Sequence, residues 1–251
     1  QPSINEPGTA MQKLQEIYRG KAKTVYATDD ANVVIMHYRD DVSAFDGAKL
    51  AKLELKGETN NRFNAYVMGR LAGSGIRTHF LRMLNERESL VKTMKMLPVE
   101  CVVRNVCAGS MAKRYGIEEG TKLREPIFEF FLKSDALHDP LVNDDHIRIL
   151  GWASADEIAQ MKALTHRVNA VLKPMFAEAG IDLVDYKLEF GHPLDAPQGP
   201  IVLGDEFTPD GCRLWDAKTG EKMDKDRFRR DLGNVIGKYR EVATRIGVPL
   251  S

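Results

Sequence analysis

The alternation of apolar and polar residues predicts a first half built mainly of strands. Runs rich in β-forming residues at 17–26 and 31–38 are separated by a short acidic turn, which predicts a hairpin. Apolar positions at helical spacing then predict a helix over 53–71, which stops before two glycines. Three more β-like runs follow this helix, at 77–84, 89–94 and 99–106.

The second half mixes strands with longer helical patterns. Residues 127–133 predict a strand, and the clearest helix begins at Ser154, where Glu157 completes a capping box. Gly180 ends this helix, and Pro174 should kink it or remove its last turn. Two more strands and a final helix are predicted at 184–190, 201–207 and 226–245.

This mixed order of strands and helices indicates an α+β or α/β fold in two lobes. We expect a β-rich N-terminal lobe over 11–96 and an α/β C-terminal lobe over 97–251. Residues 1–10 are polar, contain two prolines and a glycine, and show no periodicity, which predicts a disordered extension or a tag remnant.

Composition narrows the class of protein. The chain has 251 residues, 43% apolar and 29% charged, so it can bury a sizeable core in one or two domains. Lys and Arg balance Asp and Glu at 36 each, which counts against a nucleic-acid partner. Because it contains neither an apolar run of about 18 residues nor a signal peptide, we expect no membrane partner. Three cysteines without metal-type spacing are typical of reduced thiols in the cytoplasm.

Two lysines, Lys21 and Lys23, open the first predicted hairpin. Alternate positions of a strand share a face, so these two side chains should point the same way. Two neighbouring ammonium groups favour an anion between them, such as a di- or triphosphate, although a solvated basic face is the commoner explanation of this pattern alone. Neither a Walker A loop nor a G-x-G-x-x-G motif is present.

Acidic residues interrupt two strands of the second half. Asp185, Lys187 and Glu189 alternate with apolar residues and should share one face of their strand. Asp205 follows an apolar run, and a buried acid is costly unless it is paired or bound to a metal. If the two strands form a hairpin, Glu189 and Asp205 would lie ~5 Å apart. That spacing suits Mg²⁺ bridging nucleotide phosphates, and an exposed face with ordinary ion pairs is the alternative.

The stretch 96–110 predicts a buried strand that delivers Arg104 to a turn containing Gly109 and Ser110. A guanidinium fork, a hydroxyl and turn N–H groups together suit a phosphate monoester. A buried strand followed by an arginine-containing loop is common, so the chemistry alone leaves a structural role open.

Other motifs are less specific. The acidic, turn-rich segment 40–47 is either a plain connection or a site for a small polar substrate. The six histidines stand in no metal-ligand spacing, and the chain lacks a G-x-S-x-G elbow. Hydrolase and zinc-enzyme functions therefore have little support.

Taken in order, these stretches resemble the SAICAR synthetase family over essentially residues 11–250. The likeness rests on 97–110 and 184–191, and three shorter matches reinforce it at 20–23, 203–207 and 213–216. The loop 192–200 is longer than in the shortest members of the family, and residues 1–10 have no counterpart in it.

The resemblance implies an ATP-dependent ligase of de novo purine synthesis. It would join L-aspartate to the carboxylate of carboxyaminoimidazole ribonucleotide (CAIR), giving the succinocarboxamide SAICAR, ADP and phosphate. It also implies a fold related to ATP-grasp enzymes, with ATP in a cleft between two lobes, and a cytoplasmic homodimer that requires Mg²⁺.

The resemblance further implies roles for individual residues. Those expected to contact ATP are Lys21, Ala22, Lys23, Val25, Val91, Lys92, Met96 and Lys133. Those expected to hold Mg²⁺ are Glu189 and Asp205. Those expected to bind CAIR are Arg104, Ser110, Asp185, Lys187 and Arg213, and Arg229 is expected to bind a substrate. The segment expected near aspartate contains Ser43, Asp46 and Gly47, and the two expected catalytic residues are Lys187 and Asp224.

Two other functions fit the same residues. A small-molecule kinase would use the same ATP-binding lobe, but it would leave a phosphorylated acceptor. A ribonucleotide- or RNA-binding module would turn over no ATP and need no Mg²⁺, and the balanced charge counts against its RNA form.

Overall fold

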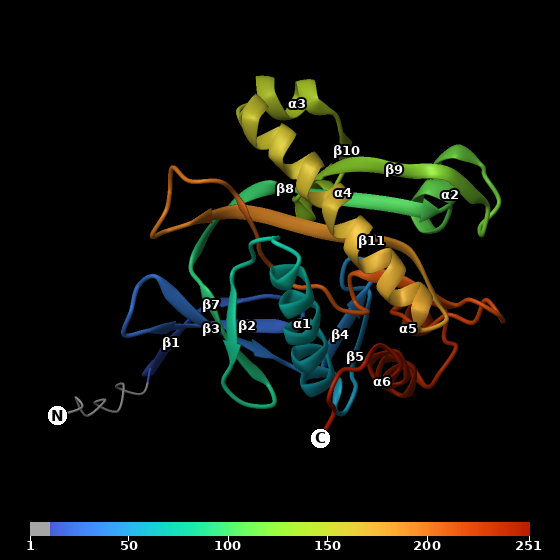
Figure 1. The fold of residues 1–251 in the computed structure, drawn as a ribbon, viewed down its shortest axis with the longest axis horizontal. Helices are drawn as coiled ribbons and strands as arrows, with labels where there is room; N and C mark the ends of the chain where they lie inside the picture. The colour runs from blue at the N-terminus through green and yellow to red at the C-terminus, as the bar shows by residue number, and fades with distance from the viewer. Residues whose placement is uncertain (1–10) are drawn as a thin grey trace.

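The computed structural model describes residues 11–251, so the predicted extension at 1–10 lies outside the described residues. A five-stranded antiparallel sheet forms the N-terminal part (Figure 1). The order of its strands is β1 (Lys13–Arg19), β2 (Lys23–Thr28), β3 (Val33–Tyr38), β7 (Glu88–Lys92) and β6 (Phe80–Met83).

Two predictions in this half need correction. The run 17–26 is two strands rather than one, because the chain turns at 20–22 and β2 returns beside β1. The segment 40–47 belongs to a small hairpin of β4 (Asp41–Ala44) and β5 (Lys49–Lys52) rather than a plain loop. The predicted helix is confirmed as α1 (Lys56–Gly73), which packs on β3, β6 and β7.

A second antiparallel sheet forms the C-terminal part. The order of its strands is β10 (Leu141–Val142), β9 (Lys122–Leu132), β8 (Met94–Val106), β11 (Ile181–Pro193) and β12 (Val202–Leu203), with β13 (Cys212–Asp216) also paired to β11. Three short helical segments were not predicted: α2 (Gly109–Tyr115), η1 (Asp135–Leu137) and α3 (Asp144–Ile149).

The long helix α4 (Ala155–Glu178) covers the second sheet, packing on β11 and β8 (Figure 1). Its predicted capping box is confirmed, because the Ser154 hydroxyl accepts from the Glu157 N–H and the Glu157 side chain accepts from the Ser154 N–H. The helix continues past Pro174 to Glu178, so the proline does not remove the last turn.

The single final helix predicted over 226–245 is wrong. The chain forms α5 (Asp226–Arg229) and α6 (Val235–Ile246), because Asp231, Gly233 and Asn234 adopt left-handed backbone angles, with φ of 54°, 71° and 47°. The strand predicted over 201–207 is shorter than expected. It covers only β12, and Asp205 beyond it has a φ of 52°.

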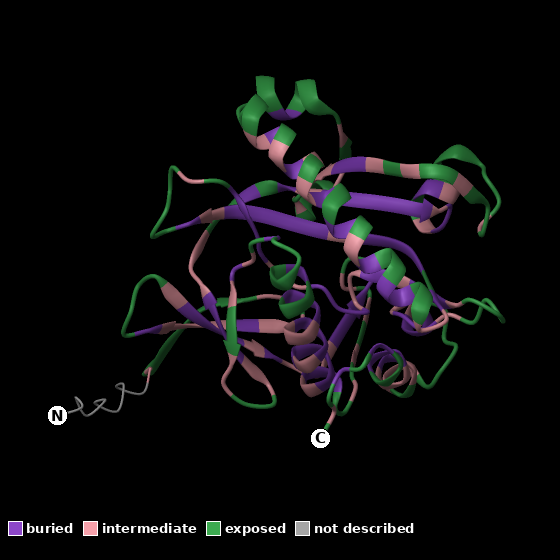
Figure 2. Ribbon diagram, viewed as in Figure 1, coloured by how far each residue is buried: buried purple, intermediate pink, exposed green. Residues whose placement is uncertain are grey.

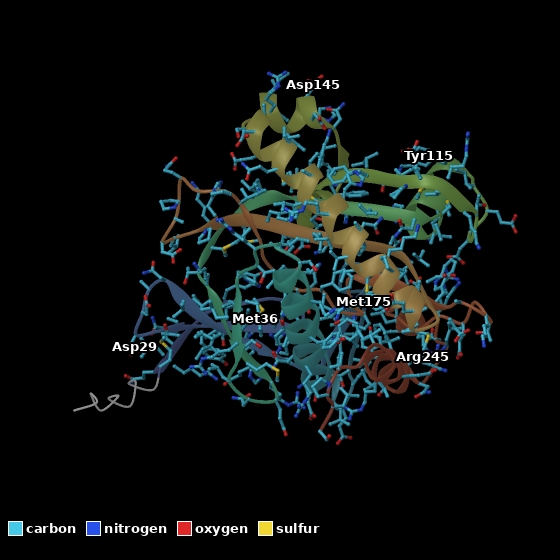
Figure 3. All side chains as sticks on the ribbon, in the orientation of Figure 1. Asp29, Met36, Tyr115, Asp145, Met175 and Arg245 are labelled. Atoms are coloured by element: carbon cyan, nitrogen blue, oxygen red, sulfur yellow. The ribbon has the colours of Figure 1, made fainter. Side chains whose placement is uncertain are left out.

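One apolar core joins the two halves. Phe63 and Leu71 of α1 belong to the same buried cluster as Val99 of β8 and Phe176 of α4. Figure 2 shows β8 and β11 buried along most of their length, while β1 is exposed. In Figure 3, Met175 lies on the side of α4 that faces α1. Within residues 11–251, every helix is too short or too polar to cross a bilayer.

Candidate active site

The paired strands β8 and β11 carry the centre of the predicted site. Asp185 of β11 lies opposite Arg104 of β8, and Glu189 lies opposite Glu100. The ladder is regular between Asp185 and Glu189, so the side chains of Asp185, Lys187 and Glu189 share one face, as the alternation predicts.

A lysine–carboxylate cluster lies at the Glu189 end of this face, and we define it as Lys23, Lys133, Lys187, Glu189 and Asp205. Lys133 Nζ lies 2.6 Å from Glu189 Oε1, and Lys23 Nζ donates to Asp205 Oδ1 at 2.5 Å. Lys187 Nζ stands between the two carboxylates, 3.6 Å from Glu189 Oε1 and 3.8 Å from Asp205 Oδ2. The structure thus brings both predicted metal ligands within reach of one lysine.

Two acids outside the cluster complete the environment of its lysines. Glu206 lies 3.1 Å from Lys23 Nζ, and Glu100 accepts from Lys187 Nζ at 3.1 Å. Burial opposes the charge of Lys23 and Lys187, but attraction to the surrounding carboxylates outweighs it and raises the pKa of both lysines. Both ammonium groups therefore remain charged at neutral pH.

The two carboxylates of the cluster differ electrostatically. Burial and the charge of Asp205 raise the pKa of Glu189, which lies in the second sheet. Burial also opposes ionisation of Asp205, but the charges of Lys23 and Lys187 outweigh it and hold its pKa well below the usual value. Asp205 is thus the more firmly charged of the pair.

The same cluster fits a hard divalent cation. Glu189 Oε1 is buried, and no donor in the described residues meets it in hydrogen-bond geometry, although Lys133 is close. No three His, Cys, Asp or Glu side chains among residues 11–251 gather as an all-protein metal site would require. Two carboxylates suffice for Mg²⁺ when phosphates and water supply the other oxygens.

The predicted pairing of Lys21 with Lys23 on one strand face is wrong, because Lys21 lies in the turn before β2. Lys21 is exposed and donates to Asp135 Oδ1 at 2.9 Å, while Lys23 reaches Asp205. Each lysine still reaches from the N-terminal half to an acid of the C-terminal half. Ala22 lies in the same turn, where its carbonyl accepts from the Arg39 N–H at 2.8 Å.

The remaining residues predicted to contact ATP lie on both sheets. Val25 and Val91 pack in one small apolar cluster on the first sheet. Met96 of β8 lies against Gly204, where an added Cβ would come within 2.9 Å of the Met96 methyl carbon. Lys92, at the end of β7, donates to Asp195 Oδ2 at 3.1 Å. The structure therefore brings the two valines together and places Met96 beside Gly204, one residue from Asp205.

An arginine–aspartate cluster lies at the other end of the β11 face, and we define it as Arg104, Arg213, Arg229, Asp185 and Asp226. Asp185 Oδ2 accepts from Arg104 Nη1 at 3.1 Å and from Arg213 Nη1 at 3.0 Å. Asp226 accepts from Arg213 Nε and from Arg229 Nη1, each at 2.8 Å. Four predicted substrate-binding residues therefore meet in one network.

Ser110 joins this network from the start of α2. Its hydroxyl accepts from Arg104 Nη2 at 3.1 Å, and Glu129 accepts from Arg104 Nε at 2.8 Å. Gly109 has a φ of 56°, and an added Cβ there would lie 2.4 Å from Arg213 Nη2. Glycine thus allows the backbone to approach the guanidinium closely.

The segment predicted near aspartate lies in the β4–β5 hairpin. Ser43 is buried in β4, and Asp46 in the turn accepts from His138 Nδ1 at 2.8 Å. Gly47, with a φ of 87°, completes that turn. Phe228 of α5 packs against two small apolar residues of β4, so the hairpin lies beside the arginine–aspartate cluster.

Asp224 is fully buried between β13 and α5. Its two carboxylate oxygens accept from the Leu214 N–H and the Asp226 N–H, each at 2.7 Å. Burial and the neighbouring charge of Asp226 raise the pKa of Asp224 to about 7. This geometry favours a role in holding β13 to α5, and the predicted catalytic role stays a prediction.

Sequence patterns missed three residues of this region. Asp226 binds two arginines of the network, and His79 contacts the backbone of Asp205. Lys225 is half-buried and makes no ion pair with any described residue within 4 Å, although burial lowers its pKa. The only sequence signal for Lys225 and Asp226 was their place at the charged start of a predicted helix. No sequence signal pointed to His79.

A cavity of about 840 Å³ lies at the start of β8, between α4 and the 192–199 loop. Its lining includes Met96, Trp152 and His192. Met96 is the one predicted site residue that borders it, so this cavity does not contain the two charged clusters.

Fold and site define a class: a two-sheet α/β protein with grouped lysines and arginines suited to phosphorylated small molecules. Residues 16–246 match the SAICAR synthetase family. The chain is 59% identical over 238 residues to the phosphoribosylaminoimidazole-succinocarboxamide synthase of Hahella chejuensis, covering 95% of this chain and 99% of the relative. It is 60% identical over 240 residues to the Alteromonas mediterranea enzyme of that name, covering 96% and 100%.

Solved structures agree with the sequence comparison. The crystal structure of the synthase from Ehrlichia chaffeensis superposes with a TM-score of 0.92 at 43% identity, covering 94% of this chain and 99% of that one. A SAICAR synthetase in complex with ADP superposes with a TM-score of 0.88 at 44% identity, covering 93% and 97%. The chain belongs to the SAICAR synthetase family. Members of this family are ligases that join L-aspartate to CAIR with ATP, which confirms the predicted ligase over the kinase and the binding module.

Proposed function

We propose that this chain joins L-aspartate to CAIR at the shared face of β8 and β11, with a separate charged cluster for each phosphate-bearing substrate. The observation that carries this proposal is that both clusters stand on one strand face. Asp185 and Glu189 are four residues apart, which corresponds to ~13 Å along β11. Lys187 lies between them and is the one predicted residue that could reach both substrates.

The lysine–carboxylate cluster is assigned to ATP. Lys23, Lys133 and Lys187 would neutralise the charge that develops on the transferred phosphoryl group. Glu189 and Asp205 would hold Mg²⁺, which supplies electrostatic stabilisation to the phosphate oxygens when bound. Val25, Val91 and Met96 would line the adenine, and Lys21, Ala22 and Lys92 would complete the nucleotide site. ADP in a relative of 44% identity supports this assignment.

The chemistry explains why a ligase needs these groups. An amine does not displace oxide from a carboxylate at a useful rate, because oxide is a poor leaving group. Phosphoryl transfer from ATP to the CAIR carboxylate creates a better leaving group, and the amine of aspartate can then attack. Exclusion of water by closure around the site would protect this acyl phosphate from hydrolysis.

The arginine–aspartate cluster is assigned to the phosphate of CAIR. Asp185 and Asp226 hold the Arg104, Arg213 and Arg229 guanidiniums in place, so little side-chain freedom remains to be lost on binding. Within the described residues, Nη2 of Arg213 and Nη2 of Arg229 donate no hydrogen bond, so both groups are available to a ligand.

Lys225 is assigned to a carboxylate of aspartate. It directly precedes Asp226, and burial disfavours its charge in the absence of a partner. A bound carboxylate would supply that partner beside the hairpin of Ser43, Asp46 and Gly47. Asp224 remains a weaker candidate for accepting the amine proton, since both of its oxygens already accept backbone hydrogens.

Cellular setting and assembly follow the family resemblance. We propose a homodimer in the cytoplasm, and the three buried free thiols support a reducing compartment. We also propose the relationship to ATP-grasp enzymes, with ATP between the two sheets. Sedimentation of the purified chain at micromolar concentration tests the dimer, and a monomer at all concentrations would contradict it.

A coupled ADP-release assay tests the proposed reaction directly. With CAIR, L-aspartate, ATP and Mg²⁺ present, we expect stoichiometric ADP, phosphate and SAICAR. Omitting any one component should stop product formation. Repeated turnover of ATP without aspartate that accumulates a stable phosphate ester of CAIR would contradict the ligase mechanism, whereas a single equivalent of acyl phosphate would be its first step.

A further inference from the structure

His79 lies where the two sheets meet. Its backbone N–H donates to the Leu203 carbonyl of β12 at 2.8 Å, and its own carbonyl accepts from the Lys92 N–H of β7 at 2.7 Å. The preceding residue, Thr78, forms an isolated parallel bridge with Leu203. The backbone of His79 is therefore hydrogen-bonded to both sheets, which leaves it little freedom to move.

The His79 side chain extends this connection to Asp205. Its Nε2 lies 2.9 Å from the backbone carbonyl oxygen of Asp205, and the side chain is only 3% exposed. A carbonyl oxygen can only accept, so Nε2 must carry the hydrogen and donate.

Asp205 has a backbone conformation that needs such support. Its φ of 52° lies in the left-handed region, which is uncommon for residues other than glycine. This turn of the chain ends β12 and directs the Asp205 carboxylate to Lys23 and Lys187. A different peptide orientation at Asp205 would move the carboxylate out of the lysine–carboxylate cluster.

We infer that His79 is a positioning residue that fixes the Asp205 peptide and thereby places the Asp205 carboxylate for the metal-bound phosphates of ATP. This inference rests on the proposed metal role of Glu189 and Asp205. His79 itself touches neither proposed substrate, and its effect passes through the backbone of one residue.

The experiment measures ADP binding by titration calorimetry, in excess Mg²⁺ and again in EDTA. The Kd in EDTA divided by the Kd in Mg²⁺ reports how much the metal strengthens ADP binding. His79→Leu removes the donor and keeps an apolar side chain, and we expect it to lower this ratio about fivefold, the size of coupling between contacting groups. His79→Gln retains a side-chain N–H at similar reach and should restore the ratio to within about twofold of the parent.

Two comparisons separate positioning from general loss of stability. Leu90→Ala removes buried apolar volume from β7, at a residue that pairs with Ile35 of β3, and it should lower the thermal midpoint but leave the ratio unchanged. His79→Leu should have little further effect on the ratio when Asp205→Asn is already present. If His79→Leu fails to fold, His79→Asn replaces it, because the shorter amide does not reach the Asp205 carbonyl.

The possible outcomes are distinguishable. A ratio unchanged by His79→Leu, or lowered equally by Leu90→Ala, would overturn the positioning role. So would an undiminished effect of His79→Leu in the Asp205→Asn background. If instead Asp205→Asn and Glu189→Gln alone leave the ratio unchanged, the proposed metal site fails, and the inference about His79 fails with it.

Discussion

The guanidinium of Arg104 satisfies two buried carboxylates, Glu129 and Asp185. Replacing it by alanine would leave both acids without that partner, and breaking a buried ion pair costs about 3–5 kcal/mol. Activity loss in Arg104→Ala would therefore mix lower stability with weaker CAIR binding. Arg213 is more exposed and approaches the site through the same Asp185, so it offers the cleaner substitution.

Arg213→Lys should weaken CAIR binding selectively. Lysine keeps the charge but loses the planar fork that Asp185 and Asp226 orient. We expect the KM for CAIR to rise about tenfold, equivalent to about 1.4 kcal/mol, with the KM for ATP nearly unchanged. Arg114→Ala, which removes a second partner of Glu129, is the matched control and should leave the KM for CAIR unchanged. A defect confined to ATP would refute the phosphate role.

Glu189→Gln should abolish Mg²⁺-dependent turnover while the protein stays folded. Glutamine keeps the size of the side chain but removes the charge that a hard cation requires. Lys133 is half-exposed and can be solvated, and Lys187 retains Glu100 and Asp205. ADP release against Mg²⁺ concentration and the thermal midpoint measure the two effects. Glu100→Gln serves as the control, and near-normal turnover in Glu189→Gln would remove the metal assignment.

Lys225→Gln should raise the KM for L-aspartate. The substitution removes a cation that burial already disfavours, so stability should not fall. We expect the KM for aspartate to rise about tenfold, because losing a charge-assisted hydrogen bond costs about 1.5 kcal/mol. Lys218→Gln on the exposed surface is the control. An unchanged KM for aspartate would place that substrate elsewhere.

A bulge in β8 interrupts its pairing with β11 just beyond Glu189, because the step from Glu189 to Gly191 faces the longer step from Glu100 to Met96. The β8–β11 register shifts between Glu189 and Gly191, where the two backbones come unusually close. A Cβ added at Gly191 would lie 2.5 Å from the Lys95 carbonyl oxygen. Glycine at this position therefore allows the bulge that ends the regular ladder at Glu189.

Gly191→Ala should separate β8 from β11 at this point. Overpacking of this kind costs about 1–3 kcal/mol, and we expect weaker ADP binding in Mg²⁺ because Glu189 moves with the strand. Gly69→Ala is the matched control, since nothing lies within 4 Å of an added Cβ there, and it should stabilise α1 by about 0.5–1 kcal/mol. Urea unfolding of both variants measures the difference, and equal stability of the two would contradict the close approach.

The strands with local signals were predictable. Alternation identified the shared face of Asp185, Lys187 and Glu189, because burial on one side of a strand has a period of two. The breaks were not predictable, because left-handed angles at Asp205 and Asn234 depend on tertiary contacts rather than on residue type. The short β12 and the divided final helix both follow from such positions.

The contacts between distant segments were also beyond the sequence. Lys23 and Asp205 are 182 positions apart, and His79 and Asp205 are 126 apart, so no spacing rule connects them. Family resemblance supplied the roles of Lys23 and Asp205, whereas His79 needed the structure. For Lys21 the sequence pattern was misleading, because the two-residue period of a strand was applied across the turn that precedes β2.

Buried polar side chains of α1 tie the two halves of the molecule together. Asn64 Oδ1 accepts from the Phe207 N–H at 2.9 Å, and Asn60 Nδ2 donates to Asp210 Oδ2 at 3.0 Å. Lys56, only 1% exposed, lies 2.5 Å from the same oxygen of Asp210. Tyr239 of α6 donates to the other oxygen at 2.7 Å, so Asp210 joins three segments.

Asp210 should make the whole protein sensitive to acid. Burial opposes its ionisation, but the charges of Lys56 and Lys225 and the hydrogen bonds from Lys56 and Tyr239 lower its pKa from 3.8 to about 2. The unfolded chain therefore binds more protons between these two values, and stability is lost as pH falls through this window. The shift in pKa corresponds to about 2 kcal/mol of folding stability, which is fully present above about pH 4.

Asp210→Asn isolates this contribution. At neutral pH the substitution leaves Lys56 buried without its anion and should cost about 3–5 kcal/mol. The stability difference from the parent should then shrink as pH falls from about 4 toward 2, because the parent loses its own ion pair there. Urea unfolding across this pH range measures the stability difference. Asp144→Asn, which breaks an exposed ion pair, is the control and should cost less than about 1 kcal/mol. A difference that stays constant with pH would show that the Lys56–Asp210 charge pair does not stabilise the folded protein.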